Sequence, residues 1–86
     1  MQTYPVEIFI KAYDRAGLLR DVSQLLANEK INVLEASSRT NRDDNYASMM
    51  LTLEVPNLHL LGRLLTRIGQ LPNVIEARRN RQERRA

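Results

Sequence analysis

Two runs of alternating apolar and polar residues constrain the fold of this chain more than any other feature. Between positions 6 and 12, and again between 46 and 55, every second residue is apolar, which is the period of a strand with one buried face. A segment with apolar residues at helical spacing follows each run, and a further strand-like segment follows each helix. The predicted elements are, in chain order, strand 6–12, helix 17–30, strand 31–40, strand 46–55, helix 58–68 and strand 74–79.

This order predicts an α+β fold built from two similar halves. We expect a ferredoxin-like βαββαβ sandwich, in which a four-stranded antiparallel sheet carries two helices on one face. The other face is then bare and of mixed character, too polar for a second core and too apolar for plain solvent surface. We expect this face, or the edge strands beside it, to pack against a partner. Its residues would be Glu7, Phe9, Lys11, Tyr13, Tyr46, Ser48, Met50 and Thr52.

The amino-acid composition argues against several kinds of site. The 86-residue chain has no cysteine, which excludes disulfides and thiolate metal ligands and fits a cytoplasmic protein. Its one histidine, His59, stands among leucines of the second predicted helix and is expected to be an ordinary surface or half-packed residue. No apolar run is long enough to span a membrane. We therefore predict no catalytic residue, no metal, no cofactor and no membrane partner.

Basic residues are concentrated at the end of the chain. Residues 78–86 contain five arginines and one glutamate, whereas the whole chain has a net charge of only +3. We predict one domain over residues 1–80 and a basic C-terminal tail over 81–86. The tail is expected to be a solvated end, with contact to nucleic acid or the ribosome as the alternative.

The segment Asp14-Arg15-Ala16-Gly17-Leu18-Leu19, between the first strand and the first helix, is the strongest candidate for a binding site. A glycine at such a junction allows a close approach of the backbone or a positive φ. The free N–H groups at the start of the following helix favour a polar or anionic guest. The residues alone leave a second interpretation open, in which Gly17 relieves a tight turn and Asp14 caps the helix.

Two other functions use the same order of elements. Acylphosphatases hold phosphate with an arginine and backbone amides in the first loop, where Arg15 stands; however, Asp14 would oppose an anion, and a glycine-rich cradle is missing. RNA-binding sheets stack bases on aromatic residues of the central strands, for which Phe9 and Tyr46 are the candidates. Because aromatic residues make up only 5% of the chain, stacking is not favoured.

Three segments resemble an ACT domain, a small regulatory module. The resemblance is narrower to the C-terminal ACT domain of RelA/SpoT-type (p)ppGpp synthetases, or GTP pyrophosphokinases, and is nearer the RelA type. The segments are 14–21, 26–34 and 74–79, and the similarity extends over nearly the whole chain, from about Val6 to Arg79. ACT domains often have proline or serine before the motif glycine, where this chain has Ala16.

The resemblance implies a regulatory domain with no catalysis of its own. Such domains form homodimers through sheet edges or faces, and many bind a free amino acid between protomers, beside the first loop and the start of a neighbour's second strand. The other implied partners are the catalytic domains of the parent protein and, in the stringent response, the ribosome with uncharged tRNA. An interaction module for ribosome or tRNA, with no small ligand, is the alternative. The implied ligand-binding residues are Asp14, Arg15, Ala16, Gly17, Leu18, Leu19, Asn32 and Val33.

Overall fold

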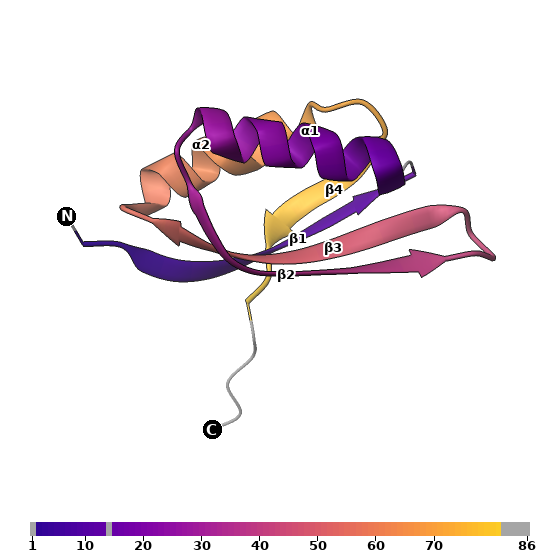
Figure 1. Ribbon diagram of the computed structural model, residues 1–86, viewed down its shortest axis with the longest axis horizontal. Helices are drawn as coiled ribbons and strands as arrows, with labels where there is room; N and C mark the ends of the chain where they lie inside the picture. The colour runs from indigo at the N-terminus through magenta and orange to yellow at the C-terminus, as the bar shows by residue number, and fades with distance from the viewer. Residues whose placement is uncertain (1, 14, 82–86) are drawn as a thin grey trace, which may run out of the picture.

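A computed structural model of the chain describes residues 2–13 and 15–81, with Arg15 described by its backbone only. The elements follow the predicted order, and they close into one antiparallel sheet with the strand order β2-β3-β1-β4. Both helices lie on the same side of this sheet (Figure 1), as the ferredoxin-like fold requires. The elements are β1 (Tyr4–Ala12), α1 (Arg15–Asn28), β2 (Asn32–Asn41), β3 (Tyr46–Val55), α2 (Leu58–Gly69) and β4 (Val74–Arg79).

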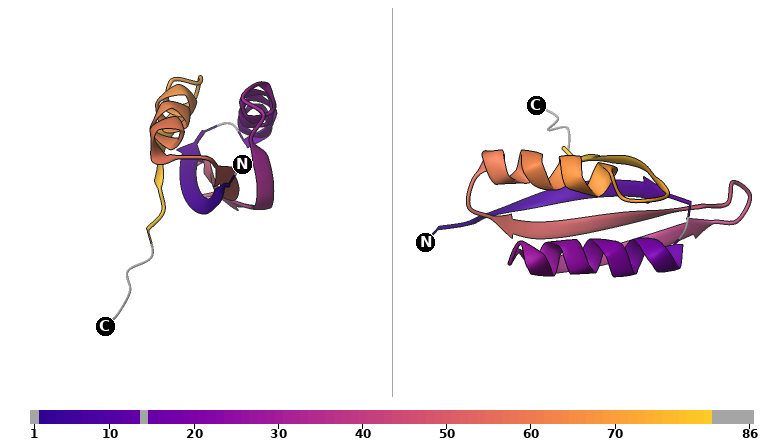
Figure 2. Two further views of the ribbon diagram at one scale, coloured as in Figure 1. Left: turned by 90° about the vertical axis from the view of Figure 1, so that its left-hand side faces the viewer. Right: turned by 90° about the horizontal axis from the view of Figure 1, so that it is seen from above.

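The core lies between the two helices and the central strands β1 and β3. The alternation seen in the sequence places one face of each strand under the helices, where α2 packs mainly on β4 and α1 on β2 and β3 (Figure 2). Cross-strand pairs such as Ile8 with Leu51 and Ile10 with Met49 form the floor of this core. The buried core residues are Val6, Ile8, Ile10, Ala12, Leu18, Val22, Leu26, Met49, Leu51, Leu53, Val55, Leu61, Leu64 and Ile68.

Helix α2 buries a narrower stripe than its leucines suggest. Leu61, Leu64 and Ile68 are buried, whereas Leu58 is 59% exposed. A helix turns by about 100° per residue, which places Leu58 at the side of the stripe formed by the three buried residues. Leu58 therefore does not belong to the core.

Two asparagines shape the ends of elements as their residue type suggests. The Asn57 side chain accepts a hydrogen bond from the Leu60 N–H at 2.8 Å, which makes it the N-cap of α2. In the β2–β3 hairpin, Asn41 Oδ1 accepts from the N–H groups of Asp43 and Asp44 at 3.0 and 3.2 Å. These two acidic residues are therefore held in a turn.

The sheet face opposite the helices is left open by the described elements (Figure 1). Two cation–ring contacts run across it, with Lys11 Nζ 4.2 Å from the centre of the Tyr46 ring and the Arg78 guanidinium 4.7 Å from that of Phe9. We call it the bare face. By strand register it comprises Pro5, Glu7, Phe9, Lys11, Asn32, Glu35, Ser37, Arg39, Asn41, Tyr46, Ser48, Met50, Thr52, Glu54, Glu76 and Arg78.

Candidate functional site

The junction between β1 and α1 lies at one end of the sheet. The last residue of β1, Ala12, pairs with Ala47 of β3 and Val74 of β4. The next residue, Tyr13, donates its N–H to the carbonyl of Asn73 at 3.0 Å, which ties the junction to the loop before β4. Helix α1 then begins at Arg15, two residues before its predicted start. The expected helix cap, Asp14, lies outside the described residues.

Gly17 has an ordinary position in this structure. It lies in the first turn of α1, and no glycine among the described residues has a positive φ. The expectation of a backbone conformation reserved for glycine is therefore wrong, because the earlier helix start puts this residue in a conformation that any residue adopts. At this position, Gly17 differs from other residues by leaving the first turn of α1 without a side chain.

The other junction residues point in different directions. Leu18 is 3% exposed and belongs to the core, whereas its neighbour Leu19 is 56% exposed. Ala16 is exposed beside it. Of the junction residues whose side chains are described, Ala16 and Leu19 therefore offer a surface to a ligand or partner, and Leu18 supports the helix from below.

Asn32 and Val33 lie at the opposite end of the sheet. They pair with Glu54 and Leu53 at the far end of β3, while the junction adjoins Ala47 at its beginning. The 14 residues of α1 separate the two sets of residues by roughly 20 Å along the helix. One copy of the chain therefore does not bring the predicted site residues together.

The outer edge of the sheet at β2 is long and open. All residues of β2 except Asn41 are exposed, and the strand pairs with β3 alone among the described strands. Val33 and Leu34 leave 40% and 47% of their surface in solvent. The Asn32 side chain donates to Glu54 Oε1 at 2.9 Å, so its own sheet holds it in place. A ten-residue edge strand that pairs with another described strand on one side only is a template for pairing with a further strand.

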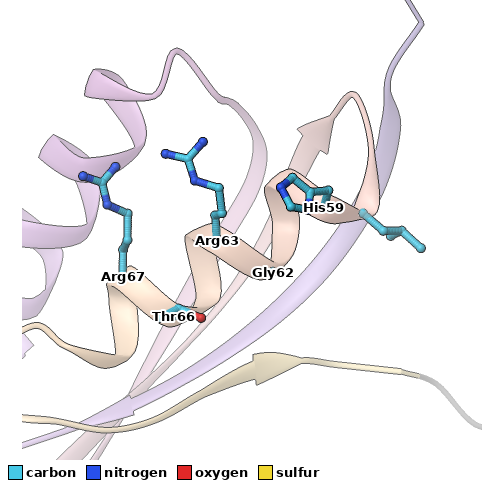
Figure 3. A pocket seen from close by; sticks show the side chains of 6 residues that line it. His59, Gly62, Arg63, Thr66 and Arg67 are labelled. Carbon is cyan, nitrogen blue, oxygen red and sulfur yellow. The ribbon is translucent and has the colours of Figure 1, made fainter.

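A row of one histidine and two arginines on α2 was not predicted from the sequence. His59, Arg63 and Arg67 stand four residues apart and project from the same side of the helix, above Gly62 and Thr66 (Figure 3). Arg67 is bonded to Glu29, in the turn that follows α1, whereas Arg63 forms no ion pair with any described residue. The sequence does show basic residues spaced by four in this helix. The leucines between them drew attention to the core-facing side instead.

The end of the chain is partly incorporated into the fold. Arg78 lies over Phe9 and donates to Glu76 Oε2 at 2.9 Å, so its charge is already engaged. Asn80 is bound to β1, since its N–H donates to the Glu7 carbonyl at 2.8 Å and its side chain to Glu7 Oε1 at 2.9 Å. Arg81 is exposed, and the rest of the predicted tail, residues 82–86, lies outside the described residues.

Two features are absent from the part of the chain that the structure describes. Residues 2–13 and 15–81 contain no cluster of three or more His, Cys, Asp or Glu side chains that could hold a metal ion. No helix within the same residues is long and apolar enough to cross a membrane.

Comparison with known proteins identifies the family of this fold. The sequence pattern of the ACT domain matches residues 1–79. The chain belongs to the ACT domain family. Among solved structures, the ACT domain from the GTP pyrophosphokinase of Chlorobium tepidum superposes with a TM-score of 0.77 at 18% identity, covering 92% of this chain and 100% of that one. That likeness supports the βαββαβ fold.

Curated relatives of this ACT domain are much longer proteins. The GTP pyrophosphokinase of Escherichia coli K12 is 46% identical over 76 residues, which cover 88% of this chain and 10% of that protein. The bifunctional (p)ppGpp synthase/hydrolase RelA of Mycobacterium tuberculosis is 38% identical over 74 residues, or 86% of this chain and 10% of that protein. The chain thus spans about a tenth of the length of these relatives. The resemblance to ACT domains of RelA/SpoT-type enzymes is confirmed.

Proposed function

We propose that this ACT domain is the C-terminal regulatory domain of a cytoplasmic (p)ppGpp synthetase. Its role would be to pair with a second copy and to bind a free amino acid where the two copies meet. The similarity to GTP pyrophosphokinases over only a tenth of their length supports a role for the domain apart from the reaction that names them. The synthetase chemistry would then belong to other domains of the parent protein.

The observation that carries this proposal is the placement of the candidate residues relative to the open edge of β2. If two β2 strands pair antiparallel about a twofold axis, the start of one strand lies beside the end of the other. The end of β2, at Asn41, is at the same sheet end as the β1–α1 junction. A second copy would therefore bring its Asn32 and Val33 towards the Ala16 and Leu19 surface, which a single copy keeps apart.

Such a site would couple ligand binding to assembly. A ligand that contacts residues of both copies binds the pair better than the single chain, and it shifts the population towards the pair. Catalytic domains attached to the two copies would then be held in one arrangement. The same coupling requires that blocking the pair also weakens binding of the ligand.

The first test is light scattering coupled to size exclusion, with and without a panel of free amino acids. We expect a dimer that one amino acid stabilises. Replacing Ala36 with lysine should weaken the β2 pairing at least about tenfold, because two like charges meet near the centre of the paired edge. The matched control is Ser23→Lys, which adds the same charge at an exposed position of α1. Loss of assembly in both variants, or in neither, would contradict pairing through β2.

A second candidate function is contact with the phosphate backbone of tRNA or ribosomal RNA. The row of His59, Arg63 and Arg67 on α2 favours it, because consecutive members of the row are about 6 Å apart along the helix axis and Arg63 has no ion pair among the described residues. The exposed sheet favours it less, since Arg78 is bonded to Glu76 and lies on Phe9.

Arg63→Glu is expected to weaken binding of tRNA about tenfold and to reduce the salt dependence by roughly one or two phosphate contacts. The control is Arg20→Glu on α1, whose side chain is also well exposed. The measurement is a titration of labelled tRNA at several salt concentrations. Equal losses in both variants would mean that only net charge matters, which would overturn a site on α2.

A further inference from the structure

We propose that one end of the sheet is a docking surface for the segment of the parent protein that leads into residue 1. The docking rests on the proposed function, in which this domain stands at the C-terminal end of a synthetase and the rest of that protein joins it at its N-terminus. A segment held there would fix the orientation of the ACT domain relative to the part of the parent protein that precedes it.

Exposed apolar side chains gather at the two ends of the sheet. Seven large apolar residues are exposed among those that the structure describes, and three of them lie at the end with the β1–α1 junction. The other four lie at the opposite end, where β1 begins and β3 ends. We call these four the entry surface, which consists of Tyr4, Val33, Leu34 and Leu58.

The strand register explains why two of these side chains are uncovered. Tyr4 lies opposite Val55, and Val33 lies opposite Leu53, so both share the sheet face on which the helices pack. Their partners on β3 are fully buried, whereas Tyr4 is 53% exposed and Val33 remains partly in solvent. The sheet therefore extends beyond its helical cover at this end, and its apolar face stays open there.

The other two side chains reach the same end for separate reasons. The pairing of β2 with β3 shifts by one residue between Val33 and Glu35, which leaves Leu34 as the extra residue of a β-bulge. Bulges on edge strands are known to redirect a side chain. Leu58 is the first residue of α2, and this helix begins directly after the end of β3. Apolar side chains from three strands and helices thus meet solvent at one place, which is typical of an interaction surface.

The position of the chain start favours the preceding segment as the occupant. The described chain begins just before β1, at the same end as the entry surface (Figure 1). About nine tenths of the length of the curated relatives lies outside the region that they share with this chain. A segment joined directly to residue 1 needs only a short connection to reach the entry surface, so its effective concentration there is high.

The free charge next to the entry surface is positive. Glu29 and Lys30 follow the end of α1, and Glu29 is bonded to Arg67. Lys30 is exposed and forms no ion pair with any described residue. The acidic side chains of this end, Glu35 and Glu54, belong to the bare face on the other side of the sheet. We therefore expect the docked segment to carry an acidic residue beside its apolar side chains.

Photo-cross-linking in the full-length parent protein identifies what lies on the entry surface. Benzoylphenylalanine replaces Leu58 in one variant and Leu34 in another. The matched control carries it in place of Ile75, which is similarly exposed, is likewise the extra residue of a bulge in an edge strand, and lies at the opposite end of the sheet. We expect the probes at positions 34 and 58 to link to the segment before residue 1 of the same chain, with no increase in the mass of the polypeptide. The probe at position 75 should not link to that segment.

Charge substitutions measure how firmly the segment is held. In the parent protein, Leu58→Asp and Leu34→Asp should each speed proteolytic cleavage of the connection before residue 1 at least about tenfold, because burial of a carboxylate against an apolar segment raises the undocked population. Ile75→Asp is the control and should leave the cleavage rate unchanged. Each variant is first checked for cooperative unfolding, which these replacements of surface residues should preserve.

The outcomes separate the docking from the proposed function. Probes at positions 34 and 58 that link to a second copy, to RNA or to nothing would overturn the docking, and so would Leu58→Asp and Leu34→Asp variants that are cleaved as slowly as Ile75→Asp. A parent protein that makes no (p)ppGpp would contradict the proposed function instead, while the cross-links would still decide the docking, since they report contact and not activity. A parent protein in which no chain precedes residue 1 would contradict both.

Discussion

Replacing Leu64 with alanine is expected to lower the free energy of unfolding by about 3–4 kcal/mol. Leu64 is 0% exposed and lies at the centre of the α2 stripe that packs on the sheet. Its removal deletes buried methyl groups and leaves a cavity that the rigid sheet below cannot fill. For a domain of this size, the loss corresponds to a decrease of roughly 15–25 °C in the melting temperature.

The same helix provides a matched control for this experiment. Leu58→Ala deletes the same atoms, but from a side chain that is 59% exposed, and should change stability by less than about 0.5 kcal/mol. Both variants are compared by urea denaturation followed by circular dichroism. Equal effects would show that α2 is rotated relative to the arrangement described here.

Truncation of two neighbouring residues of β1 should lower the stability of the domain by different amounts. Ile10 is fully buried under the helices, so Ile10→Ala should cost about 3 kcal/mol of stability. Phe9 is half-buried on the other side of the sheet, where its ring carries Arg78. Phe9→Ala should therefore cost only about 1 kcal/mol.

Both β1 variants are compared by urea denaturation at low protein concentration. A large loss of stability in Phe9→Ala, similar to that of Ile10→Ala, would contradict the assignment of one covered and one open face to the sheet.

Most of the fold was predictable because its signals are local. The alternation in β1 and β3 requires only that successive side chains of a strand point to opposite faces, and Asn57 caps α2 through an N–H only three residues away. Turn residues likewise act on their own neighbours, as Asn41 does in the hairpin. Such features depend little on the rest of the molecule.

The candidate site was predicted less well, because its features depend on exact boundaries and on position across the sheet. A helix start two residues earlier than expected was sufficient to remove the special role of Gly17. Leu18 and Leu19 look alike in the sequence, yet one is buried and the other exposed, since a helix turns by about 100° between them. The opposite placement of Asn32 and the junction follows from the length of α1 and the strand register.

The amino-acid sequence by itself determined the βαββαβ order, the covered and open faces of the sheet, and membership of the ACT family, because periodicity and motif are written along the chain. Only the tertiary structure decided which residues meet. Strand register set Asn32 at the far end of the sheet from the β1–α1 junction, and among the described strands it left β2 paired on one side only. These placements depend on pairing between distant segments, and no local pattern specifies them.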